Sequence, residues 1–194
     1  MCRTCACGLC GMDGGDLRIY VASSWRNTHQ PAVVQALRED GHEVFDFRGE
    51  EGFSWREVDD DWLNWKPQQY LSGLIHPCAE RGFNRDMTAL IRADACVMVM
   101  PCGMSASLET GWAKGAGKPT FVYVPDLREP DLMVKMADCV TSDLSIIRAL
   151  LRGEKVGGCS PEGLVSSLAG VHTGSTITDC AAAVERAEKA TGAQ

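Results

Sequence analysis

The sequence has no run of apolar residues that approaches the roughly 18 needed to span a bilayer. Its first residues, MCRTCACGLCG, also lack the apolar stretch of a secretory signal. Positive charge is scarce, since 19 Lys and Arg stand against 26 Asp and Glu and the formal net charge is −7. Nucleic acid polymers require clustered Lys and Arg on their partners. These absences predict a cytoplasmic protein that binds neither a membrane nor a nucleic acid polymer.

Two common catalytic patterns are missing as well. The four histidines have no motif context that would build a Ser-His-Asp arrangement, so each is interpreted as structural. The glycine-rich segment G-W-A-K-G-A-G-K-P (111–119) ends a helix and enters a strand, which is the reverse of the order in a Walker loop. Binding of one phosphate by backbone N–H groups stays open, because it needs no net positive charge.

Strands and helices are expected to alternate along residues 17–152, in a chain that is 45% hydrophobic and 23% charged. Short apolar runs predict strands at 17–23, 42–47, 95–101, 119–125 and 139–142. Helical spacing predicts helices at 31–40, 55–65, 83–95, 105–118, 129–138 and 143–151. This alternation predicts a doubly wound α/β fold of the flavodoxin or Rossmann-like type, with a mainly parallel five-stranded sheet.

Two segments flank this expected domain. Residues 1–16 form a Cys-rich appendage, and residues 153–194 form a tail that is expected to be part-helical, with an Ala-rich helix at 178–194. Thiolates at short spacing bind zinc readily, and the appendage contains the pattern C-x2-C-x-C-x2-C, formed by Cys2, Cys5, Cys7 and Cys10. No second half supports such a site, so the sequence predicts no firm metal site and no cofactor.

The stretch from Arg48 to Gly82 follows the second expected strand and contains Trp55, Trp62 and Trp65. A long insertion at this place in an α/β protein is often a lid or a substrate loop. It can equally be a pair of surface helices that covers one edge of the sheet. The sequence leaves both interpretations open.

Polar residues gather where the first and third expected strands end. The first strand runs into Ser23, Ser24, Trp25, Arg26 and Asn27, and the third runs into the segment from Cys102 to Ser107. These two ends are expected to be neighbours at the point where strand order reverses, which is where doubly wound sheets bind ligands. The side chains that follow the two strands are therefore candidates for one cleft.

Two carboxylates lie on helices beside this expected cleft. Glu109 is placed in the first turn of its helix, where the helix dipole would stabilise the anion and suit an ionised nucleophile. Alternatively, Glu109 completes a capping box, and Ser105 and Ser107 are helix caps. Asp86 lies on the preceding helix, and its alternative interpretation is a solvated surface residue.

Three segments together resemble the nucleoside 2-deoxyribosyltransferase family, which includes deoxynucleoside 5′-monophosphate N-glycosidases. They are I-Y-V-A-S-S-W (19–25), N-R-D-M-T-A-L-I-R-A-D (84–94) and S-A-S-L-E-T-G-W-A-K-G-A-G-K-P (105–119). The family similarly has an I-Y-x-(A/G) first strand, an Asp on the helix before strand three, and a Glu in an E-x-G-x-A…G-K motif. The match covers roughly residues 18–150.

The resemblance implies a role for each matching residue. Glu109 would be the nucleophile that attacks C1′ of a 2-deoxyribosyl group, with Tyr20 orienting it and Asp86 holding the sugar hydroxyls. Trp25 would lie against the base. The remaining candidates for substrate binding, several of them toward a phosphate, are Ser23, Ser24, Gly103, Ser105 and Ser107.

The implied activity is cleavage or exchange of the N-glycosidic bond of a 2-deoxyribonucleoside or its 5′-monophosphate, through a covalent glycosyl-Glu intermediate. The loop P-C-G-M-S-A-S (101–107) lacks the acid with which many transferases of the family help to protonate the base, which favours hydrolysis of a nucleotide over base exchange. A homo-oligomer is implied as well. Two alternatives remain: a non-catalytic nucleotide-binding or sensing module of the same fold, and an α/β interaction domain in which Glu109 is only a cap.

Overall fold

The sheet of this protein has five strands and is parallel throughout. The computed structural model describes residues 15–49, 52–126, 130–154 and 156. The strands are β1 (Arg18–Ala22), β2 (Glu43–Phe45), β3 (Ala95–Val99), β4 (Thr120–Tyr123) and β5 (Cys139–Thr141). They lie in the order β2-β1-β3-β4-β5, and each adjacent pair is parallel. The predicted doubly wound α/β fold is therefore confirmed.

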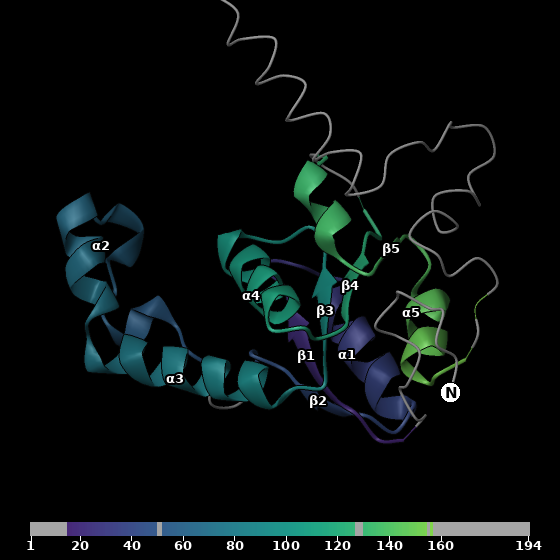
Figure 1. Cartoon of the computed structure of the whole chain (residues 1–194). Coiled ribbons are helices and arrows are strands. Elements are labelled where there is room, and N and C mark those ends of the chain that lie inside the picture. Colours follow the sequence, from purple (N-terminus) through teal and green to yellow (C-terminus); the bar gives the residue numbers. More distant parts are fainter. Residues whose placement is uncertain (1–14, 50–51, 127–129, 155, 157–194) are drawn as a thin grey trace, which may run out of the picture. The chain divides into compact units, whose positions relative to one another are not determined.

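Helices cover both faces of this sheet (Figure 1). The described α-helices are α1 (Gln30–Glu39), α2 (Pro67–Leu74), α3 (Pro77–Arg92), α4 (Met104–Gly115) and α5 (Leu144–Leu151). In Figure 1, α1 and α5 lie on one side of the strands, and α3 and α4 lie on the other. The chain can reverse after α1 because Gly41 has a φ of 91°, a conformation that favours glycine.

The face of the sheet toward α3 and α4 carries the side chains that the site uses. Strand residues that alternate along the chain point to this face and pack against buried residues of the two helices. The cluster consists of Tyr20, Ala22, Cys96, Met98 and Val122 from the strands, Leu90 and Ala93 from α3 and its end, and Ala106 and Ala113 from α4. Small alanines on α4 let the helix approach the strands closely, so residues on its inner side lie next to β1 and β3.

Two expected helices are 3₁₀ turns instead. The segment 55–65 forms η1 (Trp55–Glu57) and η2 (Trp62–Asn64). Asp59 lies between the two turns, and its carboxylate accepts hydrogen bonds from the Asp61 N–H and the Trp65 indole N–H. These local bonds compete with a continuous helix. The described part of the second segment, 130–138, likewise contains η3 (Leu132–Met136) in place of an α-helix, and Asp131 caps this turn by accepting from the Met133 N–H.

The insertion between β2 and α3 packs against the amino-terminal half of α3, where Phe53 lies against Gly82. Figure 1 shows α3 extending beyond the sheet, with α2 at its outer end. Trp55 packs edge-to-face against both Trp65 and Tyr70, with ring centroids 5.5 and 6.0 Å apart. A Cβ on Gly73 would lie 2.6 Å from the Trp65 ring, so only glycine allows this approach. The insertion therefore forms a small aromatic cluster of its own on α3.

The chain divides into two units, Met1–Gly157 and Gly158–Gln194, and the described residues belong to the first. Cys2, Cys5, Cys7 and Cys10, and the helix expected at 178–194, lie outside the described residues. Within the described ranges, no group of three or more His, Cys, Asp or Glu side chains is arranged to hold a metal ion. None of the helices there has the length and apolar character needed to cross a bilayer.

Candidate active site

The loops after β1 and β3 meet at the carboxyl edge of the sheet, where strand order reverses. The Ser23 hydroxyl donates a hydrogen bond to the Val99 carbonyl at 2.9 Å. The buried Asn27 amide donates to the carbonyls of Val99 and Pro101, at 2.9 and 3.0 Å. Two side chains of one loop thus hold the backbone of the other, and the expectation that these strand ends are neighbours is confirmed.

A third loop joins them through Arg48, which follows β2. The Arg48 guanidinium donates to the carbonyls of Ser24 and Asn27, at 2.5 and 2.7 Å, and lies over the Phe47 ring. Burial lowers the pKa of Arg48. The β1–α1 loop is therefore fixed from both sides, by the loops that follow β2 and β3.

Glu109 lies in the second turn of α4, because the helix begins at Met104 and its first turn contains no acidic residue. The predicted first-turn position is therefore wrong, and so is the predicted stabilisation of the anion by the helix dipole, which falls off within one turn. Burial, reinforced by the charge of Asp86, raises the pKa of Glu109 from 4.5 to about 7. A hydrogen bond from the Tyr20 hydroxyl opposes this rise. The carboxyl is thus poised to gain or lose a proton near neutral pH.

Tyr20 comes from the middle of β1 and is 1% exposed. Its ring stacks on Phe45 of β2, with centroids 5.2 Å apart and an interplanar angle of 16°. Burial first, and then the charges of Glu109 and Asp86, raise the pKa of Tyr20 far above its ordinary range. Tyr20 is therefore a neutral, rigidly held hydrogen-bond donor to Glu109.

Asp86 lies in α3, on the side of the helix that faces the same cluster. Its side chain is 29% exposed. Burial raises the pKa of Asp86, and the adjacent Arg85 guanidinium opposes this by donating two hydrogen bonds to Asp86 Oδ1, at 3.0 and 2.7 Å. The structure thus brings Tyr20, Asp86 and Glu109 close enough to act on each other's ionisation, and Asp86 is not the freely solvated surface residue of the alternative interpretation.

The serines of the β3–α4 loop do not cap the helix. Gly103 is the N-cap residue of α4, and no side chain accepts a hydrogen bond from the first turn at that position. Ser105 and Ser107 are exposed, and the Ser107 hydroxyl makes one long bond of 3.4 Å to the Gly103 carbonyl. A Cβ on Gly103 would meet no atom within 4 Å. The start of α4 therefore offers open space, N–H groups without a side-chain cap among the described residues, and two exposed serines.

The other candidates after β1 have different surroundings. The hydroxyl of Ser23 is used within the fold, as described above, and the Ser24 hydroxyl accepts from the Arg26 N–H at 3.2 Å. Trp25 is 55% exposed and packs edge-to-face on Phe47, with centroids 5.3 Å apart. The Trp25 ring is thus accessible beside the site. The Ser23 hydroxyl, by contrast, already donates its hydrogen bond to a backbone carbonyl.

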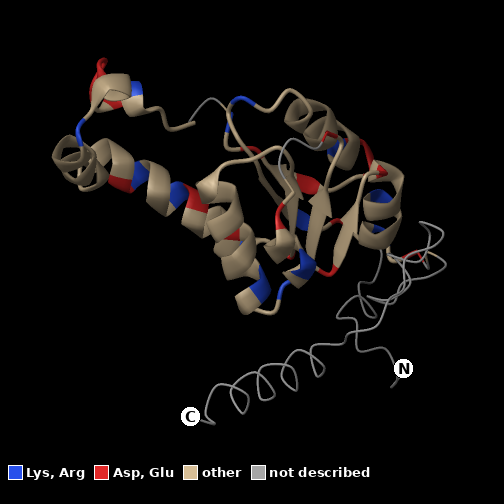
Figure 2. Ribbon diagram, turned by 90° about the horizontal axis from the view of Figure 1, so that it is seen from above, with Lys and Arg blue, Asp and Glu red and all other residues tan. Residues whose placement is uncertain are grey.

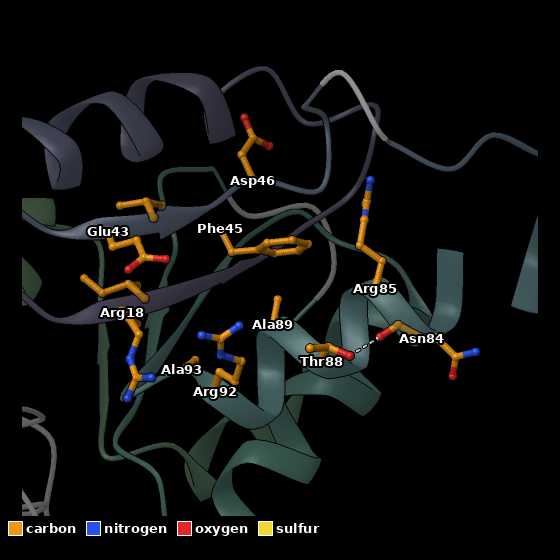
Figure 3. A pocket seen from close by; sticks show the side chains of 12 residues that line it. Arg18, Glu43, Phe45, Asp46, Asn84, Arg85, Thr88, Ala89, Arg92 and Ala93 are labelled. Carbon is orange, nitrogen blue, oxygen red and sulfur yellow. Dashed lines mark hydrogen bonds between the residues drawn. The ribbon is translucent and has the colours of Figure 1, made fainter. Parts of the chain in front are cut away.

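A cavity of about 550 Å³ lies next to this cluster, between the edge strand β2 and α3 (Figure 3). Ala89 and Ala93 of α3 and the Phe45 ring line its apolar part, and Arg85 and Asp46 line one end. Tyr20, Asp86 and Glu109 are not among its lining residues. Phe45 and Arg85 therefore separate the cavity from the three predicted catalytic residues while touching both.

Several residues of the site were not among the sequence candidates. Arg85 and Phe45 contact the predicted catalytic residues, and Asn27 and Arg48 fix the loops. Asn27 belongs to the polar residues at the end of the first strand, without an assigned role there, and Arg85 directly precedes Asp86, so position in the sequence was the available signal. The roles themselves depend on backbone carbonyls of distant segments, which no local pattern specifies.

No family model matches the chain, and no curated protein matches it. Among solved structures, the chain is similar to a 2-deoxyribosyltransferase from the psychrotolerant bacterium Bacillus psychrosaccharolyticus. The two share 22% sequence identity with a TM-score of 0.46, and the match covers 67% of this chain and 89% of that one.

Proposed function

We propose that the protein cleaves or exchanges the N-glycosidic bond of a 2-deoxyribonucleoside or its 5′-monophosphate. The observation that carries this proposal is the cluster of Tyr20, Asp86 and Glu109 on the sheet face toward α3 and α4, with the pKa of Glu109 raised to about 7. Burial of two carboxyls beside each other costs stability, and groups perturbed in this way cluster at functional sites. An anion beneath C1′ is what an oxocarbenium-like transition state requires.

In this mechanism the Glu109 carboxylate attacks C1′. The bond between its oxygen and C1′ forms as the bond from C1′ to the base nitrogen breaks, and the electron pair of that bond leaves with the base. The base takes up a proton from water, since the loop 101–107 contains no acid. Water or the nitrogen of a second free base then attacks C1′ as the ester bond from C1′ to Glu109 breaks, and its proton passes to the hydroxide left when the first base was protonated. This regenerates the Glu109 carboxylate, restores the original configuration at C1′, and releases 2-deoxyribose, its 5-phosphate or a new nucleoside.

Tyr20 and Asp86 support this chemistry in different ways. The Tyr20 hydroxyl donates to one Glu109 oxygen and so holds the carboxylate in one orientation. Asp86 is the acceptor for a sugar hydroxyl. Its negative charge also disfavours ionisation of Glu109 in the free protein, and positive charge developing on the sugar ring relieves this repulsion.

The start of α4 suits a 5′-phosphate. Its backbone N–H groups lack a side-chain cap, and Ser105 and Ser107 are exposed beside the open position in front of Gly103. Helix N-termini with free N–H groups favour anions without requiring basic side chains. Trp25 supplies an exposed ring on which the base can stack. A nucleoside monophosphate is therefore the preferred substrate class.

A homo-oligomer belongs to the same proposal. Met104, Leu108 and Trp112 recur four residues apart along α4 and expose 80%, 67% and 40% of their surfaces. This spacing places them on one stripe of the helix that carries Glu109. Apolar stripes of this kind mark contact surfaces. Light scattering after size-exclusion chromatography tests the oligomer, and Leu108→Glu should convert it to a monomer.

The experiment that tests the activity is a chromatographic product assay. Purified protein is incubated with deoxynucleosides and deoxynucleoside monophosphates, each with and without a free acceptor base. Glu109→Ala is the inactive variant, and Glu39→Ala, at an exposed position on α1, is the matched control. Release of base by the wild type and the control, but not by Glu109→Ala, supports the proposal, and dependence on the acceptor separates exchange from hydrolysis.

Two other outcomes contradict the proposal. Equal base release by Glu109→Ala and the wild type excludes Glu109 as the nucleophile. Saturable binding of a nucleotide by calorimetry, with no product from any substrate, identifies the non-catalytic binding module instead.

A further inference from the structure

Among the residues that the structure describes, Arg85 contacts three groups around the candidate site. Its Nε and Nη2 atoms donate to Asp86 Oδ1, at 3.0 and 2.7 Å. Nη2 also donates to the Phe47 carbonyl at 3.2 Å. The guanidinium carbon lies 5.4 Å from the centroid of the Phe45 ring. Because the planar guanidinium meets a carboxylate, a carbonyl and an aromatic face at once, its orientation is fixed.

These contacts distinguish the two oxygens of Asp86. Both bonds from Arg85 end on Oδ1. Oδ2 accepts no hydrogen bond from any residue that the structure describes. A partly exposed carboxylate with one oxygen occupied and the other open is oriented to accept a bond from a ligand on the open side.

The same guanidinium links Asp86 to the residues that hold Glu109. The Phe45 ring under Arg85 stacks on Tyr20, whose hydroxyl donates to Glu109. The Phe47 carbonyl belongs to the chain that leads into Arg48 and the fixed β1–α1 loop. Arg85 of α3 thus contacts β2 directly, and it is connected through Phe45 and Tyr20 to β1 and to Glu109 of α4.

We propose that Arg85 is a positioning residue: it holds Asp86 by Oδ1 so that Oδ2 accepts the 3′-hydroxyl of the 2-deoxyribosyl group. This inference rests on the proposed function, and it adds the residue that sets the geometry of sugar recognition. Lysine can pair with Oδ1 but is a point charge, so it cannot bond Phe47 and cover Phe45 at the same time.

The test compares two substrates that differ only in the 3′-hydroxyl. The 2′-deoxynucleotide that the wild type cleaves fastest and its 2′,3′-dideoxy counterpart are assayed with wild type, Arg85→Gln, Arg85→Lys and Arg81→Gln. Arg81 lies one turn earlier on α3 and is 68% exposed, so it is the matched control. A charge-assisted hydrogen bond predicts that Arg85→Gln lowers kcat/KM for the 2′-deoxy substrate roughly 10- to 100-fold.

The dideoxy substrate provides the readout that a merely structural role would not give. Since it cannot bond Asp86, Arg85→Gln should change its kcat/KM less than about threefold. Arg85→Lys should fall between wild type and Arg85→Gln on the 2′-deoxy substrate, and Arg81→Gln should match wild type on both.

Each other outcome overturns a specific statement. Equal losses on both substrates overturn the role of Arg85 and leave the proposed function standing. Equal rates of the wild type on the two substrates also overturn it, because Asp86 then makes no use of the 3′-hydroxyl. Failure of the wild type to cleave any substrate overturns the proposed function, and the role of Arg85 with it.

Discussion

Acidic residues near the two ends of the sheet have pKa values that are shifted in opposite directions. At the amino end, Asp94 accepts two bonds from the Arg18 side chain, and Asp40 is held by Arg148 and Arg152. Arginine bonding lowers the pKa of both carboxyls. At the carboxyl end, burial raises the pKa of Glu109 and Asp86 instead.

This difference separates the residues that stabilise the fold from those available for chemistry. A carboxylate bound by arginine on both oxygens has fewer acceptor positions left for a ligand and keeps its charge over the whole physiological range. Glu109 has no arginine partner among the causes of its shift, and its neighbour Asp86 is of like charge. Figure 2 shows both basic and acidic residues along α3, and Arg85 of this helix pairs with Asp86.

The largest expected effect comes from removing the charge at the carboxyl end. Glu109→Gln should lower the rate of base release by roughly a thousandfold or more, because the amide cannot form the glycosyl ester. The rate is measured by single-turnover chromatography with enzyme in excess. A residual rate within tenfold of wild type would assign the chemistry to another residue.

The same variant, Glu109→Gln, should become more stable relative to the wild type as pH rises. Between pH 4.5 and about 7 the folded protein holds a proton on Glu109 that the unfolded chain releases, so the wild type loses stability as pH rises. Glu109→Gln lacks this loss. Urea unfolding at pH 5 and pH 8 should show the variant gaining about 2 to 3 kcal/mol on the wild type over that interval. A constant difference between the two proteins would show that Glu109 has an ordinary pKa.

At the amino end of the sheet, removal of a carboxylate should lower the free energy of unfolding. Asp40→Ala leaves the partly buried guanidinium groups of Arg148 and Arg152 without their shared partner and should cost about 2 kcal/mol at pH 7. The pKa of Asp40 is lowered, so this contribution is present above its ordinary value and is lost as pH falls through the lowered one. Urea denaturation measures the loss, and base release should stay unchanged. A parallel loss of activity in the folded variant would couple the two ends.

The pH dependence of catalysis should show a smaller effect. Since the nucleophile must be ionised, kcat/KM should rise with pH to a plateau, with a midpoint near 7 in the free enzyme. At pH 6 the value should be about tenfold below the plateau. Initial rates of base release between pH 5 and 9 give the profile. In Asp86→Asn the midpoint should move down, because the neighbouring negative charge is gone.

The smallest effect is expected at Asp94. Arg18 and Asp94 expose 47% and 36% of their side chains, and exposed ion pairs contribute little. Asp94→Ala should therefore cost less than about 1 kcal/mol in urea unfolding, and added salt should reduce the cost further. A loss comparable with that of Asp40→Ala would show that exposure does not explain the ranking.

The sequence predicts the sheet well because its strands are buried on both faces. The apolar run around Tyr20 and the segment 95–101 are too short for membrane spans and too continuous for half-exposed strands. The elements that differ are those in which side-chain bonds replace a helix, as Asp59 does between the two 3₁₀ turns. Such bonds depend on the path of the chain, which the apolar pattern does not contain.

The sequence pointed to the candidate residues but not to the electrostatics that join them. The order of motifs pointed to Tyr20, Asp86 and Glu109, and α4 begins at Met104, one residue before the predicted start. The ionisation of Glu109, however, depends on burial and on the charge of Asp86, which belongs to another helix. The contact between Arg85 and the Phe47 carbonyl is likewise a property of the packed structure.

The two hydrogen bonds that the Asn27 amide donates to the carbonyls of Val99 and Pro101 have a consequence for how this scaffold can change. Asn27, Ser23 and Arg48 hold the loops through backbone carbonyls, which every residue type supplies. Side chains at the neighbouring positions 24–26, at 103–105 and at 107 can therefore be replaced without altering the spacing between the loops. Directed evolution of substrate preference should succeed at those positions while the three anchors are kept.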